Sequence, residues 1–164
     1  LGDMIDQGSY TKAAWVWRDY GFNVKNNIVS GNTGHAFYAP FSEGGRLSSG
    51  HNGNYNAVQD PDSIPEAVWT FVAVTYDPSV ENGTMTLYRS GVQVAQSTGI
   101  EPPEDNHTTY IGRFGGGNVF YGFIDEVAIW DEALSDSEIE ELSSITNDMD
   151  ATDNRGSYSS SLYI

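Results

Sequence analysis

The segment 121–142 constrains the fold more than any other part of this chain. Its first ten residues, YGFIDEVAIW, have the composition of a strand, and a turn and a short helix are predicted to follow. Ser135 and Glu138 have the spacing of a capping box, in which each residue satisfies a backbone N–H of the other. Ile139 and Leu142 then give the helix one apolar edge. The segment therefore predicts a strand that leads directly into one capped helix of about two turns.

Short strand-like segments separated by turn residues make up most of the remaining sequence. Aromatic residues reach 13% and glycines number 18, which suits an all-β protein with frequent tight turns. Residues 50–65 are polar and rich in Asn, Asp, Gly and Pro, and we expect a long loop there. Roughly ten to twelve short strands and one helix predict a two-sheet antiparallel β-sandwich. The expected strands are 12–18, 27–30, 35–38, 46–49, 68–76, 85–89, 92–96, 109–113 and 123–130.

The length of 164 residues suits one domain with a substantial core. We expect this domain to span residues 1–145. Residues 146–164 are polar and are predicted to be a tail or linker, although Leu162–Ile164 could pair as an edge strand. Because the chain begins at Leu1 without a leader, we interpret it as a monomeric domain of a larger protein.

The charge is strongly acidic, with 23 acids, 7 bases and a net charge of -16. Such a surface repels phosphate backbones and anionic lipids, which argues against nucleic acid and membrane partners. The sequence holds no run of 18 apolar residues, so membrane insertion is not expected. The acids could bind divalent cations or could simply keep the protein soluble. The absence of cysteine suits both a cytosolic protein and a bacterial exported domain stabilised by metal.

Five short motifs carry a family resemblance. They are WTFVAVTYD at 69–77, MTLYRSG at 85–91, YIG at 110–112, GFIDEV at 122–127 and ALSDSEI at 133–139. In this order they resemble laminin-G-like domains of the concanavalin A-like type, over residues 1–143. Thr70 and Phe71 stand where the family often has two histidines. The resemblance implies a concanavalin A-like jelly roll, a fold shared by lectins, carbohydrate-binding modules, adhesins, pentraxins and some hydrolases and lyases.

The sequence does not favour an enzyme. Retaining hydrolases with this sandwich carry a Glu-x-Asp-x-Glu or Glu-x-Asp-x-x-Glu run, which is absent here. Asp125 and Glu126 are adjacent, so a regular strand would point them to opposite faces. The three histidines, His35, His51 and His107, show no metal-protease or triad spacing.

Calcium is the cofactor that we expect. It prefers carboxylate, amide and carbonyl oxygens, which acidic loops at a sandwich rim can supply. Domains similar to this one commonly hold a structural calcium near the two chain ends, which implies Asp125 as a ligand, with Asp3 and Asp6 as further candidates. The alternative for Asp125 is a carboxylate bonded to backbone N–H groups.

Glycan binding needs an aromatic face together with planar polar groups that bind hydroxyls. We predict such contacts from two clusters and from one residue beside the Gly115–Gly117 loop. They are Arg46, His51, Asn52, Asn54 and Tyr55 in the first, Trp17, Arg18 and Tyr20 in the second, and Arg113 beside the loop. The alternatives are a solvated loop for the first cluster, sheet-face packing for Trp17 and a simple flexible turn for the glycine loop.

Together these features predict a calcium-assisted glycan-binding domain at the cell surface or outside the cell. Its parent would be a bacterial adhesin or a polysaccharide-active protein, and its ligand a glycan, a polysaccharide or a cell-surface glycoprotein. A protein- or peptide-interaction module, or a spacer in a large surface protein, is the main alternative. An active glycosidase or lyase is less favoured, because it rests on fold analogy alone.

Overall fold

The computed structural model describes residue 5 and residues 7–21, 27–31, 34–38, 45–104, 108–115 and 117–145. Within these ranges the chain forms two five-stranded sheets, in which all paired strands are antiparallel, and one helix. Sheet A has the order β10 (Gly122–Trp130), β1 (Tyr10–Arg18), β6 (Trp69–Asp77), β7 (Thr84–Arg89) and β8 (Val92–Ser97). Sheet B has the order β5 (Asn54–Ser63), β4 (Arg46–His51), β3 (His35–Tyr38), β2 (Val29–Gly31) and β9 (Thr109–Ile111). The helix α1 is Asp136–Ile145.

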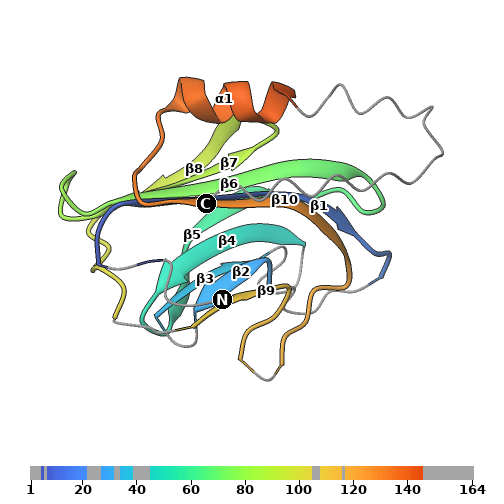
Figure 1. The fold of residues 1–164 in the computed structure, drawn as a ribbon, viewed down its shortest axis with the longest axis horizontal. Helices are drawn as coiled ribbons and strands as arrows, with labels where there is room; N and C mark the ends of the chain where they lie inside the picture. The colour runs from blue at the N-terminus through green and yellow to red at the C-terminus, as the bar shows by residue number, and fades with distance from the viewer. Residues whose placement is uncertain are drawn as a thin grey trace.

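The two sheets face each other as a sandwich, with α1 on the outer side of sheet A (Figure 1). Alternate side chains of each strand fill the space between the sheets, as strand geometry requires. Ala14 and Val16 of β1 contribute to this core, as do Val72 and Val74 of β6. The predicted all-β sandwich with one short C-terminal helix is therefore confirmed.

Helix α1 covers one part of the outer face of sheet A. Ile139 is fully buried there, in a second apolar cluster with Ala13, Phe71, Ala73 and Tyr88 of the sheet. The capping box predicted at its start is present. The Ser135 N–H donates to the Glu138 carboxylate at 2.8 Å, and the Glu138 N–H donates to the Ser135 hydroxyl at 3.4 Å.

The prediction of a long loop over residues 50–65 is wrong. This segment forms the end of β4, a tight turn and the whole of β5. Asn52 and Gly53 make the turn, with φ angles of 51° and 88°. The sequence pattern misled because β5 is an edge strand, so it keeps polar residues exposed and accommodates Pro61.

Candidate functional site

An open groove lies where the β4–β5 turn meets the segment that follows β8. Its volume is about 450 Å³. Its lining residues are His51, Asn52, Asn54, Ala57, Ser97, Thr98, Gly99, Ile100 and Glu101. Three of the predicted ligand residues, His51, Asn52 and Asn54, therefore gather at one groove.

His51 anchors the wall of this groove from inside the core. Its side chain is 4% exposed, with Nδ1 2.8 Å from the Glu101 carbonyl and Nε2 2.7 Å from the Tyr10 hydroxyl. Because a carbonyl oxygen only accepts, Nδ1 carries the proton and Nε2 accepts from Tyr10. Burial lowers the pKa of His51 to about 4. At neutral pH the imidazole is therefore an uncharged structural link.

Asn52 and Asn54 have different surroundings. The Asn52 amide donates to the Pro102 carbonyl at 2.9 Å and accepts from the Glu104 N–H at 2.8 Å, so it ties the segment 102–104 to the turn. Asn54 begins β5 with an exposed side chain. Near it, Glu101 exposes its side chain while its carbonyl binds His51. Asn54 and Glu101 are thus the polar groups best placed to meet a ligand.

Tyr55 and Arg46 do not line the groove. Tyr55 packs edge-on against Phe114, with ring centroids 5.3 Å apart, and lies 6.3 Å from the Tyr38 ring. Arg46 is exposed at the start of β4, whereas His51 ends the same strand. Five residues of strand separate them by roughly 17 Å. The structure therefore does not bring Arg46 to the groove.

Trp17, Arg18 and Tyr20 do not form one site either. Trp17 lies half-buried on the outer face of sheet A, while Arg18, the next residue of the strand, is buried. Arg18 donates to the Ile64 carbonyl at 2.9 Å and pairs with Glu66 at 3.1 Å. Tyr20 is 71% exposed beyond the end of β1.

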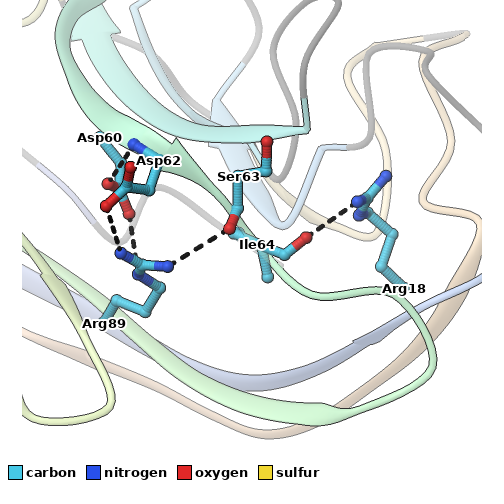
Figure 2. Close-up of polar contacts among 6 residues, drawn as sticks. All are labelled: Arg18, Asp60, Asp62, Ser63, Ile64 and Arg89. Atoms are coloured by element: carbon cyan, nitrogen blue, oxygen red, sulfur yellow. Dashed lines mark hydrogen bonds and ion pairs between the residues drawn. The ribbon is translucent and has the colours of Figure 1, made fainter.

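A second arginine holds the same connection between the sheets. In Figure 2, Arg89 of β7 and Arg18 contact the segment 60–64, where β5 ends and the chain crosses to sheet A. Arg89 lies 3.0 Å from the buried carboxylate of Asp60 and 3.5 Å from Asp62. These ion pairs fix the crossover and account for Arg18 as a structural residue.

Arg113 is exposed, and its guanidinium lies 4.7 Å from the centre of the Tyr110 ring, a cation–π contact. Its carbonyl accepts hydrogen bonds from Asn27 at 2.6 Å and Ser30 at 2.8 Å. Arg113 thus belongs to the β2–β9 side of sheet B rather than to the groove, which segments 51–57 and 97–101 line.

The candidate calcium ligands are only partly described. Asp125 is exposed in the middle of β10, and its carboxylate accepts from the Glu126 N–H at 2.8 Å. A β-bulge interrupts the strand here, and Glu126 has a φ of 48°, so the regular alternation expected for the pair does not hold. Asp3 and Asp6 lie outside the described residues. No group of three or more potential metal ligands gathers in the described part of the chain, which contains Asp125 alone of the three candidates, and the calcium site stays a prediction.

Sequence reasoning missed the residues 97–101 that line the groove, and also a polar cluster inside the core. Lys12 is fully buried on the inner face of β1, with its amine 2.8 Å from His35 Nδ1. Burial lowers the pKa of both Lys12 and His35. The alternation of Lys12 with Ala14 and Val16 in the sequence was the available signal for its inward position.

The chain belongs to the concanavalin A-like lectin/glucanases superfamily. The family model, Laminin_G_3, matches residues 2–140. The domain is therefore of the concanavalin A-like lectin type. No curated protein matches the chain. No helix within the described ranges has the length and apolar character needed to cross a bilayer.

Several solved structures share the fold. A putative carbohydrate binding protein from Bacteroides ovatus is 25% identical, with a TM-score of 0.69, over 82% of this chain and 40% of that one. Domain 4 of AbnA, a GH43 extracellular arabinanase from Geobacillus stearothermophilus, in complex with arabinotriose, is 22% identical, with a TM-score of 0.63, over 83% and 68%. The CBM40 of a Ruminococcus gnavus sialidase, bound to α2,3 sialyllactose, is 15% identical, with a TM-score of 0.60, over 85% and 83%.

Proposed function

We propose that this domain binds glycans without cleaving them, and that the groove beside Asn54 and Glu101 is its binding site. The observation that carries the proposal is the groove itself, whose volume of about 450 Å³ falls in the range of small-ligand sites. Three structural neighbours support the same class of ligand: a putative carbohydrate binding protein and two domains that were solved with arabinotriose or with sialyllactose bound.

The groove has the chemistry that a sugar requires. The Asn54 amide offers both donors and an acceptor, the Glu101 carboxylate offers acceptors, and the hydroxyls of Ser97 and Thr98 offer both. Ile100 and Ala57 supply apolar surface for the C–H face of a ring. The exposed Glu101 and the net charge of -16 favour an uncharged glycan over an anionic one at this site.

The proposal extends to calcium and to an extracellular location, in an adhesin or a polysaccharide-active protein. The acid excess and the lack of cysteine support it, because a metal can replace disulfides as a stabilising link. Asp125, with Asp3 and Asp6, would hold the metal, and calcium bound there would stiffen the rim of the sandwich.

A glycan array probed in millimolar calcium and again in EDTA tests the function. We expect uncharged glycans to bind, and Asn54→Ala to lose that binding while the melting temperature stays unchanged. Asn56→Ala is the matched control, because Asn56 is exposed on the same strand but does not line the groove. Calcium-dependent binding would support the metal, whereas equal binding in EDTA would contradict it.

Three outcomes would overturn the proposal. A blank array with folded protein would do so, as would selective capture of a protein or peptide without any glycan. Turnover of a polysaccharide that a single carboxylate substitution abolishes would replace binding with catalysis.

A further inference from the structure

Three aromatic side chains form a row across the outer face of sheet A. Trp17 of β1 is the direct cross-strand partner of Phe123 on β10 and of Trp69 on β6. We call Trp17, Trp69 and Phe123 the aromatic row. No single stretch of sequence contains it, because its members come from three strands that only the fold brings together.

The rings form one contiguous cluster. The ring centroids of Trp17 and Phe123 are 5.4 Å apart, and those of Trp69 and Phe123 are 6.5 Å apart. Strands β6 and β10 lie on either side of β1, so their backbones are about 10 Å apart. Trp69 and Phe123 therefore lean towards each other across β1, whose Trp17 side chain is half-buried.

The row is not part of either apolar core. The cluster under α1 includes Trp15 and Phe71, one step further along the sheet, but none of the three row residues. Trp69 is 44% exposed and Phe123 is 60% exposed. Packing within the described part of the domain accordingly does not explain why two large aromatic residues remain in solvent.

The size and surroundings of the row narrow the choice of partner. Two aromatic side chains at these exposures present about 200 Å², well below the roughly 800 Å² per partner of a stable protein interface. The exposed carboxylate of Asp125 lies two residues from Phe123 on β10. Arg18, the basic residue next to Trp17, is buried and paired. The row therefore offers aromatic faces in an acidic setting.

We propose that the aromatic row is a second carbohydrate contact, which stacks against the pyranose rings of an uncharged polysaccharide. The C–H face of a sugar ring packs on an aromatic face, and the exposed rings of Trp69 and Phe123 present such faces to solvent. Acidic polysaccharides are excluded by the surrounding charge. This inference extends the proposed function to a separate surface and names its ligand class.

Native affinity electrophoresis tests the proposal directly. Gels contain hydroxyethyl cellulose, xylan or galactomannan as uncharged polymers, and polygalacturonate as the anionic one. We expect at least one uncharged polymer to retard the domain and polygalacturonate to leave its mobility unchanged. Trp69→Ala/Phe123→Ala should weaken the retardation about tenfold, as the loss of two stacking contacts implies.

The control is Val92→Ala/Ile111→Ala, which removes exposed apolar side chains at 65% and 45% exposure from other strands and should leave retardation unchanged. Trp69→Tyr/Phe123→Tyr keeps two aromatic rings and should retain most of the binding. It therefore distinguishes a loss of stacking from a folding defect in the double alanine variant.

Asn54→Ala separates this proposal from the groove. If the row binds but the groove does not, Asn54→Ala is retarded like the parent. Retardation by none of the uncharged polymers would overturn the proposal. So would equal retardation of the folded Trp69→Ala/Phe123→Ala variant, or binding of this surface only to a protein or to a second copy of the domain.

Discussion

Acidification should destabilise this domain through His51. The imidazole is buried, donates to Glu101 and accepts from Tyr10, and its ring lies edge-on to Tyr76 with centroids 4.7 Å apart. Lys12 lowers its pKa further by charge repulsion, although burial is the larger cause. The folded state thus favours the neutral imidazole, whereas the unfolded chain protonates it readily.

The magnitude follows from the two pKa values. The pKa of His51 falls from 6.5 to about 4 on folding. Between these values the unfolded state binds a proton that the folded state does not, so the free energy of unfolding falls as the pH falls. The contribution is fully present above pH 6.5, and the loss reaches ~2 kcal/mol at pH 5 and ~3 kcal/mol near pH 4. The lowered pKa of His35 acts in the same direction.

Urea unfolding at pH 7, 6 and 5, followed by tryptophan fluorescence, measures this loss in the parent and in His51→Gln. Glutamine can donate to the Glu101 carbonyl and accept from the Tyr10 hydroxyl, but it does not titrate. The difference between parent and variant isolates His51 from groups of opposite sign, such as Asp60, whose pKa burial raises. The parent should lose ~2 kcal/mol more than the variant between pH 7 and pH 5. Equal losses would refute the reasoning.

Three further predictions concern the scaffold. Arg89→Met should lower the free energy of unfolding by about 3 kcal/mol at neutral pH, because it leaves the Asp60 carboxylate buried without its ion pair. Adding Asp60→Asn should recover part of that loss, as measured by urea unfolding. Gly122→Ala should lower the free energy of unfolding by roughly 3 kcal/mol, because Gly122 has a φ of 136° and a Cβ would collide with the Trp17 carbonyl. Gly117→Ala is the control and should be near neutral, because a Cβ there meets open space. Equal melting temperatures for the two variants would contradict this prediction. Calcium at a hundredfold excess over its dissociation constant should stabilise the domain by ~2.7 kcal/mol relative to EDTA. An unchanged melting curve would count against the metal.

Local sequence patterns were sufficient to predict the elements that are defined by residues close together in the chain. The capping box at Ser135 and Glu138 and the hairpin around Ser90 and Gly91 depend on residues a few positions apart, and both are present. The strand predicted at 68–76, which the structure has at Trp69–Asp77, was equally clear, because it is buried along nearly its whole length and its sequence is correspondingly apolar.

Features that depend on pairing between distant strands could not be predicted in this way. The aromatic row needs the register of β1 with both β6 and β10, which no local pattern contains. The groove needs the segment after β8 to meet the β4–β5 turn. The edge position of β5 explains why a polar strand was interpreted as a loop.

The ties between the β4–β5 turn and the segment 100–104 bear on the thermodynamics of ligand binding. His51 holds the Glu101 carbonyl, Asn52 holds the Pro102 carbonyl and the Glu104 N–H, and the Tyr76 hydroxyl donates to the Ile100 carbonyl at 2.8 Å. A wall that is already ordered loses little conformational entropy when a ligand arrives. Small sugars should consequently bind this groove with high efficiency per atom, and longer oligosaccharides should gain affinity only from the contacts that they add.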